Sequence, residues 1–316
     1  MSKKIKLEMN KIEIPKELSE RSKMGILKAK TEKQKNRKGS RLTSIGIVAG
    51  LLVSIGTFAF FNTGSSPNET KSKQATPVVA NNSGVKIPAI QLPQGNSKAD
   101  MIGLIVYHGK IYTQTDTEID TENAKAIKGE KLGTTKGTID EWSKQKAYAK
   151  EFASNIENAD VYSVKGYDQD FRIMAYGESG GKPYAAFYEN LNGITIKSGD
   201  DVFGKLKMTG NIVAASYRTF TDWDNNLANY RSVANIEILN AFVKELNKAK
   251  PFVRGRNSDP ISSLNNENFK ELTIQLKDGS KVRLKLLKDG YIYYGYMGAY
   301  FKMDDALFLR LWSQLQ

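Results

Sequence analysis

The sequence predicts an α+β protein in which a single transmembrane helix precedes an extracellular domain of antiparallel sheets and a few helices. Three observations support this: an uncharged apolar run over residues 42–61, strand-like runs separated by Gly-containing turns from residue 101 onward, and one amphipathic helical pattern over residues 232–248. The predicted organisation comprises a basic tail, a span, a linker and two α+β units, over residues 1–41, 42–61, 62–100, 101–230 and 231–316.

Residues 42–61 form the predicted transmembrane helix. They contain no charged residue, and a helix of 20 residues extends roughly 30 Å, the thickness of the hydrocarbon core of a bilayer. The preceding stretch KQKNRKGSR carries five Lys and Arg residues. Because positive charge is retained on the cytoplasmic side, we expect a single-pass protein of the cell membrane with its N-terminus inside and residues 62–316 outside.

A signal peptide and a buried core helix both fit this apolar run less well. A cleaved signal peptide has a short basic start, whereas here a 41-residue hydrophilic tail precedes a full-length span and no A-x-A site follows. A buried core helix fits poorly beside five cations. Gly46 and Gly50 have the G-x-x-x-G spacing that lets two membrane helices pack closely, although Gly is also common in membrane helices in general.

Charge and cysteine content exclude several classes of function. The formal net charge is +13, but residues 1–41 contain 14 Lys or Arg and 5 Asp or Glu, so most of the excess lies in the tail. A uniformly basic domain would indicate nucleic-acid binding, whereas a basic tail beside an apolar run indicates membrane topology, so we predict no nucleic-acid partner. The absence of cysteine excludes disulfides, thiol catalysis and thiolate metal sites.

The N-terminal tail contains a short motif that suggests a protein partner. Residues 12–18 read IEIPKEL, and Pro15 suits the first turn of a helix, where its missing N–H would have no partner in any case. The apolar face of such a helix is too thin to fold alone. The segment is therefore either disordered or folds against a partner.

The motif, the basic stretch and the single span together resemble the inner segment of membrane-anchored anti-sigma factors of Bacillus-like Gram-positive bacteria, over roughly the first 61 residues. The resemblance implies that Ile12, Ile14, Pro15 and Leu18 contact an extracytoplasmic-function sigma factor and hold it away from RNA polymerase. It also implies that the domain outside senses a signal and that membrane proteases then free the sigma factor. The tail lacks the His/Cys zinc site of the better-known anti-sigma class, so only the short, zinc-free class applies.

Two alternatives remain beside this interpretation. In the first, the tail only sets topology, and the chain is a cell-surface binding or wall-associated protein with no signalling role. In the second, Asp222, Asp224, Asp304 and Asp305 supply paired carboxylates to a wall-active hydrolase, although Asp304 and Asp305 also suit the N-terminus of the last helix. The extracellular ligand is not identified by the sequence.

Residues 62–100 predict a flexible linker, because they are rich in Asn, Ser, Thr, Pro, Gln and Lys and offer little apolar surface to bury. The exception is the stretch VKIP at residues 85–88. We expect this stretch to dock on the domain as an edge segment.

Residues 101–316 carry the pattern of a folded domain. Runs rich in β-branched and aromatic residues predict strands over residues 102–107, 111–115, 160–164, 171–176, 184–188, 272–276, 282–287, 291–296 and 300–303. Helices are predicted over residues 232–248, near residues 141–155 and from residue 304 onward. A similar order of elements in residues 139–206 and 232–315 suggests two similar units, which chance similarity explains equally well.

No motif in this domain predicts catalysis, so we do not expect an enzyme. Residues 177–181 read GESGG and match G-x-S-x-G. However, another strand follows them and the only histidine, His108, precedes them, so we interpret them as a hairpin turn and His108 as an exposed turn residue.

No metal or other cofactor is predicted either. Asp116, Glu118, Asp120 and Glu122 alternate as in a calcium loop but lack the Gly and Glu of an EF-hand, so we interpret them as a solvated acidic face. Five tyrosines crowd residues 291–300, and the alternation of a strand predicts that some of them are exposed and suited to a glycan or peptide. Ordinary packing of aromatic side chains on the sheet is the commoner arrangement.

Overall fold

The computed structural model describes residues 79–81, 84–91, 102–179, 182–254, 260–303 and 306–315. The predicted tail and span lie outside these residues. Within the described ranges, no helix is both long and apolar enough to cross a bilayer. The described part is rich in strands, contains a few helices, and pairs its strands antiparallel, as the sequence predicts.

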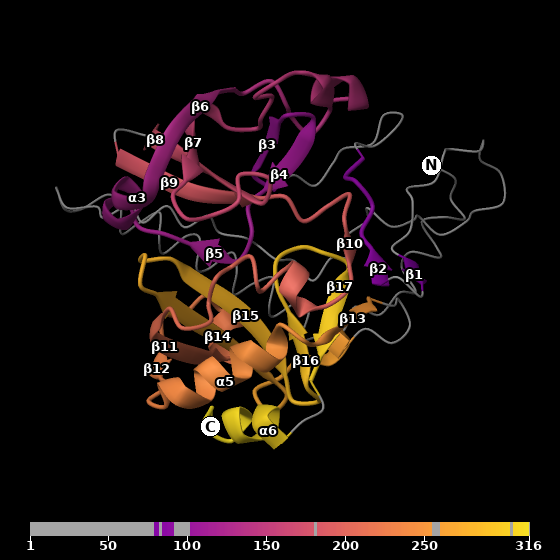
Figure 1. Cartoon of the computed structure of the whole chain (residues 1–316), viewed down its shortest axis with the longest axis vertical. Helices are drawn as coiled ribbons and strands as arrows, with labels where there is room; N and C mark the ends of the chain where they lie inside the picture. The colour runs from indigo at the N-terminus through magenta and orange to yellow at the C-terminus, as the bar shows by residue number, and fades with distance from the viewer. Residues whose placement is uncertain are drawn as a thin grey trace, which may run out of the picture. The chain divides into compact units, whose positions relative to one another are not determined.

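A six-stranded sheet is formed by the described part of residues 104–189, in the order β3-β4-β9-β8-β7-β6 (Figure 1). The strands are β3 (Leu104–Tyr107), β4 (Lys110–Thr113), β6 (Lys128–Lys136), β7 (Glu157–Val164), β8 (Arg172–Ser179) and β9 (Lys182–Glu189). His108 is exposed in the turn between β3 and β4, as predicted. β8 and β9 pair up to Ser179 and Lys182, which confirms a hairpin in place of a nucleophile elbow.

The second sheet contains eight of the described strands, seven of them in the order β12-β11-β14-β15-β16-β17-β13, with β5 paired to β15. The strands are β5 (Thr117–Glu118), β11 (Ile212–Thr219), β12 (Arg231–Ser232), β13 (Lys250–Val253), β14 (Phe269–Leu276), β15 (Lys281–Leu287), β16 (Tyr291–Tyr293) and β17 (Ala299–Lys302). β5 and β11 belong to this sheet although they precede residue 231, so the sheets do not coincide with the predicted units 101–230 and 231–316.

Short helices and a third, small sheet complete the described structure. The helices are α3 (Thr121–Ile127), η1 (Gln145–Ala149), η2 (Gly199–Asp201), α4 (Phe220–Asp224), α5 (Ile236–Leu246), η3 (Pro260–Ser263) and α6 (Ala306–Trp312). The small sheet has the order β1-β2-β10, with β1 (Val79–Asn81), β2 (Gly84–Lys86) and β10 (Thr195–Ile196).

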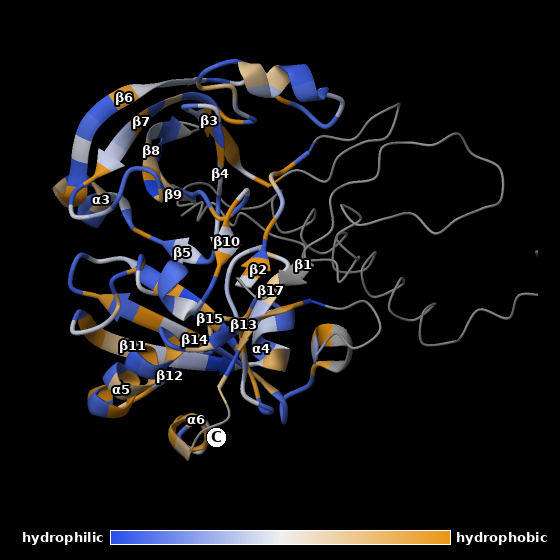
Figure 2. Ribbon diagram, turned by 45° about the vertical axis from the view of Figure 1, so that its right-hand side comes forward, coloured by the Kyte–Doolittle hydropathy of each residue, from blue (hydrophilic) through white to orange (hydrophobic). Residues whose placement is uncertain are grey.

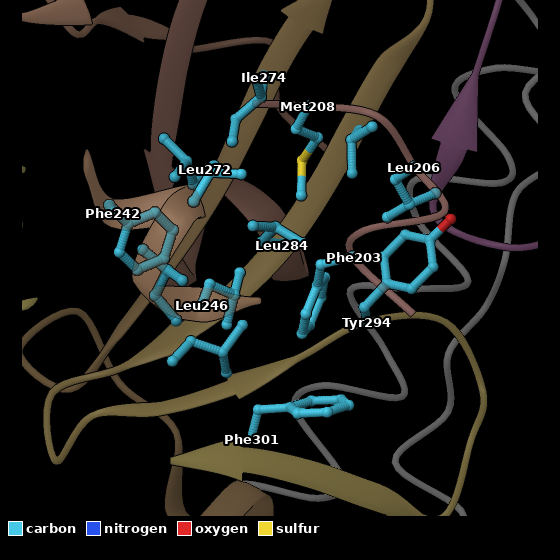
Figure 3. Close-up of a cluster of buried hydrophobic side chains, with 14 of the residues drawn as sticks. Phe203, Leu206, Met208, Phe242, Leu246, Leu272, Ile274, Leu284, Tyr294 and Phe301 are labelled. Atoms are coloured by element: carbon cyan, nitrogen blue, oxygen red, sulfur yellow. The ribbon is translucent and has the colours of Figure 1, made fainter. Parts of the chain in front are cut away.

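The largest core lies between the eight-stranded sheet and the helices α5 and α6. The side chain of Asn235 caps the first turn of α5 by accepting a hydrogen bond from the N–H of Ile238. The buried face of α5 then places Phe242 and Leu246 beside Leu272 and the other sheet residues of the cluster (Figure 3). The strands β14 and β15 alternate between hydrophobic and hydrophilic residues, as a sheet with one buried apolar face requires (Figure 2).

The prediction of a helix near residues 141–155 is wrong, because the segment contains only the short 3-10 helix η1. Trp142 is 49% exposed, so the segment does not bury a continuous helical face. Its last residues instead run beside β3, where the N–H of Phe152 donates to the carbonyl of Val106 and the N–H of Val106 donates to the carbonyl of Ala153. The backbone of this segment therefore forms hydrogen bonds with the edge strand β3 instead of forming a helix.

The linker predicted over residues 62–100 includes an ordered part. Residues 84–91 are docked on the domain, with Val85 and Ile87 buried in the largest core. The expectation that residues 85–88 dock is therefore confirmed, but not as an edge segment, because β2 is the middle strand of the small sheet, between β1 and β10. Burial of two apolar side chains at alternate positions adds to the pairing of this short strand with β1 and β10.

The tyrosines of residues 291–300 are mainly packing residues. Tyr293, Tyr294 and Tyr300 are buried, in keeping with the commoner arrangement of aromatic packing, whereas Tyr291 and Tyr296 are partly exposed. The alternation expected of a strand stops because β16 ends at Tyr293 and the chain turns through Gly295, which has a φ of 62°.

Candidate functional site

The residues predicted from the sequence to bind the sigma factor or to pack in the membrane lie outside the described ranges. These are the sigma-factor contacts Ile12, Ile14, Pro15 and Leu18, and the helix-packing residues Gly46 and Gly50. Within the described ranges, no group of three or more His, Asp or Glu residues is arranged to hold a metal ion. Buried polar and charged side chains are instead concentrated where the six-stranded and eight-stranded sheets meet. We call this contact region between the two sheets the joint.

Arg172 and Glu189 form the centre of the joint. They are directly opposed on β8 and β9, and both side chains are fully buried. The Nε and Nη2 atoms of Arg172 lie 3.0 and 2.5 Å from Oε1 of Glu189. Burial opposes the charge of the guanidinium, but the carboxylate of Glu189 raises the pKa of Arg172 above its usual value. The guanidinium is therefore held in its charged form beside the carboxyl group of Glu189 inside the domain.

Tyr294 connects this pair to the second sheet. Its hydroxyl donates to Oε2 of Glu189 over 2.6 Å, and Thr115 donates to the same oxygen over 2.9 Å. The hydroxyls of Tyr294 and Thr117 are 2.6 Å apart. Burial, followed by the negative charge of Glu189, raises the pKa of Tyr294 well above its ordinary value. The tyrosine consequently remains protonated and acts as a hydrogen-bond donor.

The guanidinium of Arg172 is also enclosed by aromatic rings. Its central carbon lies 4.3 Å from the ring centre of Tyr167 and 4.5 Å from that of Phe187. In the described part of the chain, its Nη1 atom is buried without a hydrogen-bond partner. The π faces compensate part of the lost hydration, because an aromatic face attracts a cation.

Asp116 makes a second connection across the joint. It lies between β4 and β5, and its Oδ2 accepts hydrogen bonds of 2.9 Å from Lys285 Nζ and from the backbone N–H of Gly295. Glu118, two residues later, pairs with Arg283. Asp120 caps α3 by accepting from the N–H of Asn123. The prediction of a solvated acidic face is therefore wrong for Asp116, whose side chain is 13% exposed and has an ion-pair partner on β15.

Tyr167 and Asp278 make a third connection. The hydroxyl of Tyr167 donates to Oδ2 of Asp278 over 2.7 Å, and Ser280 donates to the other carboxylate oxygen. Burial acts to raise the pKa of Asp278, but the hydrogen bonds from Ser280 and Tyr167 outweigh it and hold the pKa below the usual range. The turn between β14 and β15 is thereby attached to the six-stranded sheet.

A row of alternating charges continues across the eight-stranded sheet. Arg218 on β11 is opposite Glu271 on β14, which is opposite Lys285 on β15. The Nε of Arg218 lies 2.6 Å from Oε1 of Glu271, and both side chains are buried. Burial raises the pKa of Glu271 above its ordinary value, although Arg218 opposes the shift. This row connects β11, the strand next to the edge strand β12, to Asp116 at the joint.

The carboxylates of the joint form ion pairs or hydrogen bonds with other residues of the domain. Glu189 and Glu271 are each bound to an arginine. Asp222, one of the candidate hydrolase carboxylates, forms a capping box with Thr219 at the start of α4. Asp304 and Asp305 lie outside the described residues. Asp224, the last of these candidates, is exposed at the end of α4.

Comparison of the chain with protein-family models, with curated proteins and with solved structures finds no match.

Proposed function

We propose that this chain is a single-pass membrane anti-sigma factor. Its cytoplasmic tail would fold against an extracytoplasmic-function sigma factor and mask the face that binds RNA polymerase. Its outer domain would sense a ligand, after which membrane proteases cut the outer region and then the span. The observation that carries this proposal is the order along the chain, in which IEIPKEL, a basic stretch and an uncharged run over residues 42–61 precede a folded domain.

The joint is consistent with a sensing role. The contacts described there are mainly hydrogen bonds and ion pairs, such as Glu189 with Tyr294 and Asp116 with Lys285. Polar contacts of this kind specify one orientation and contribute little net free energy, so a ligand with modest preference for another orientation can shift it. A ligand must bind the two orientations with different affinity to do so.

The decisive experiment is capture of the sigma factor by the full-length protein in detergent. We expect the extracytoplasmic-function sigma factor of the host to copurify with the wild type, and Ile12→Asp or Ile14→Asp to abolish this, because a charge would be buried at the contact. Ile5→Asp is the matched control: it introduces the same charge into the tail outside the motif and should leave capture unchanged. Failure of the wild type to bind any host sigma factor would rule the proposal out.

Topology requires a separate measurement. Protease added to intact protoplasts should digest a C-terminal tag and leave an N-terminal tag protected. The alternative, a cell-surface binding protein without a signalling role, gives the same topology. It differs in that replacement of residues 1–41 by another basic sequence of equal length would leave sigma-dependent transcription unchanged.

A further inference from the structure

Residues 84–91 lie across the joint as a short strap. The strand β2 at the start of the strap pairs antiparallel with β10, with Val85 opposite Ile196 and Lys86 opposite Thr195. Beyond the strand, the N–H of Ile87 donates to the carbonyl of Ile194 over 2.8 Å. The strap therefore runs beside the segment that leads from β9 of the first sheet into the small sheet and onward to the second.

The strap contacts the cores of both sheets. Val85 and Ile87 are 2% and 5% exposed and belong to the large core that contains α5. Ile90 packs against the separate cluster of the six-stranded sheet, beside Leu104 and Ile111. A single eight-residue segment thus inserts side chains into the apolar clusters on either side of the joint.

Asn192 connects the strap to β4 of the six-stranded sheet. Its Oδ1 accepts from the N–H of Ile90 over 3.3 Å, and its Nδ2 donates to the carbonyl of Ile111 over 2.7 Å. Because Asn192 lies in the connection between β9 and β10, a shift of one sheet relative to the other alters the path on which the strap rests.

Few interactions hold the strap compared with the sheets that it crosses. β2 has three registered pairs with β1 and two with β10, whereas β8 and β9 alone share eight. Short, lightly paired elements open at a lower free energy than long central strands. The close approach at Gly84 adds a constraint, since its φ is +124° and a Cβ there would lie 2.3 Å from the carbonyl oxygen of Ile196.

We propose that residues 84–91 form a releasable strap, which opens as a unit while both sheets remain folded and which couples the joint to the chain that leads towards residues 42–61. Opening would expose Val85, Ile87 and Ile90 and would free the chain up to the six-stranded sheet. The coupling to transcription rests on the proposed function; the opening itself does not.

Hydrogen exchange on the full-length protein in detergent tests the opening. We expect the amides of residues 85–87 to exchange about tenfold or more faster than those of β14 and β15. The absence of cysteine allows the strap to be locked by a single engineered disulfide, Lys86→Cys with Thr195→Cys, at two exposed and directly opposed positions. Oxidation should slow exchange at residues 85–87 to the rate of the sheet, and reduction should restore it.

A second disulfide provides the control. Gln275→Cys with Lys281→Cys joins opposed residues of β14 and β15 and should leave exchange in the strap unchanged. The opening is refuted if residues 85–87 of the wild type exchange as slowly as β14 and β15, because the strap would then open only when the domain unfolds.

A transcription reporter tests the coupling separately. If the proposed function holds, deletion of residues 1–41 should switch on a reporter of sigma-dependent transcription. A reporter that does not respond would refute that function and would leave the hydrogen-exchange result unaffected. Given a responsive reporter, Gly84→Ala should raise its basal output and the Lys86–Thr195 lock should lower it. Unchanged output from both variants would refute the coupling.

Discussion

Arg172 and Glu189 face each other on β8 and β9, fully buried, and the hydroxyl of Tyr294 reaches Glu189 from the second sheet. The ion pair is formed within one sheet, and the second sheet is attached to it by a neutral donor. The charge of Arg172 is therefore balanced within the six-stranded sheet, and this connection to the second sheet consists of hydrogen bonds to one carboxylate. Single substitutions can separate these contributions.

Glu189→Gln should destabilise the domain strongly. The substitution preserves the shape of the side chain but leaves Arg172 as an uncompensated buried charge, at a cost of about 3–5 kcal/mol in unfolding free energy. Urea denaturation of the full-length protein in detergent measures the loss. Glu178→Gln, at an exposed position of the same hairpin, is the control and should change the unfolding free energy by about 0.5 kcal/mol or less. A small effect at Glu189 would mean that the pair is not desolvated.

Tyr294→Phe should weaken the attachment between the sheets. The change removes one donor to Glu189 and one partner of Thr117 and leaves their oxygens buried, at a cost of about 1–3 kcal/mol. The unfolding free energy of this variant should be compared with that of Tyr291→Phe, a partly exposed tyrosine two residues before the end of β16. Equal effects of the two substitutions would contradict a special role for the Tyr294 hydroxyl.

Asp278→Asn should reduce the dependence of stability on acid. The pKa of Asp278 is lower in the folded chain than in the unfolded one, so the unfolded state binds more protons as the pH falls. Its carboxylate therefore contributes stability above the unfolded pKa of about 3.9, and this contribution is lost as the pH falls through the folded pKa. Unfolding free energies measured from about pH 2 to 5 should decline less steeply for the variant. If the unfolding free energy of the variant depended on pH as steeply as that of the wild type, Asp278 would not contribute to the loss of stability in acid.

Gly84→Ala should undock the strap. An alanine Cβ would contact the carbonyl oxygen of Ile196 at an unfavourable φ, so exchange at residues 85–87 should accelerate while β14 and β15 are unaffected. Gly109→Ala, in the turn between β3 and β4, is the control for alanine at a positive-φ glycine outside the strap. It also has a positive φ, +69°, but no atom lies within 4 Å of the added Cβ, so it introduces backbone strain without a clash. Similar exchange in the strap of both variants would argue against the close approach at Gly84.

Much of the secondary structure was predictable because the strands are short, apolar and bounded by Gly turns. All nine predicted strands overlap strands of the structure. β6 and β11 were not predicted, since β6 is rich in Lys and Gly and β11 contains Ala and Ser, residues that give weak strand signals. Their positions are determined by pairing with β7 and β14, which is a property of the tertiary structure.

The pairing of Arg172 with Glu189 at the joint could have been predicted from the sequence, but the contact with Tyr294 could not. A hairpin centred between Gly180 and Gly181 pairs residues at equal distances from the turn, which places Arg172 opposite Glu189. Two opposite charges on otherwise apolar runs were therefore a readable signal that sequence reasoning missed. Tyr294 could not be assigned in the same way, because its contact with Glu189 depends on how the two sheets dock.

The position of β5 has a consequence for cutting the chain into pieces. Thr117 and Glu118 belong to the second sheet, yet they lie between β4 and β6 of the first. A fragment that begins after β9 would lack this strand, and a fragment that ends there would carry it without β15 to pair with. We therefore expect both fragments to be less stable than the intact region, and equilibrium unfolding of that region to follow one cooperative transition shared by both sheets.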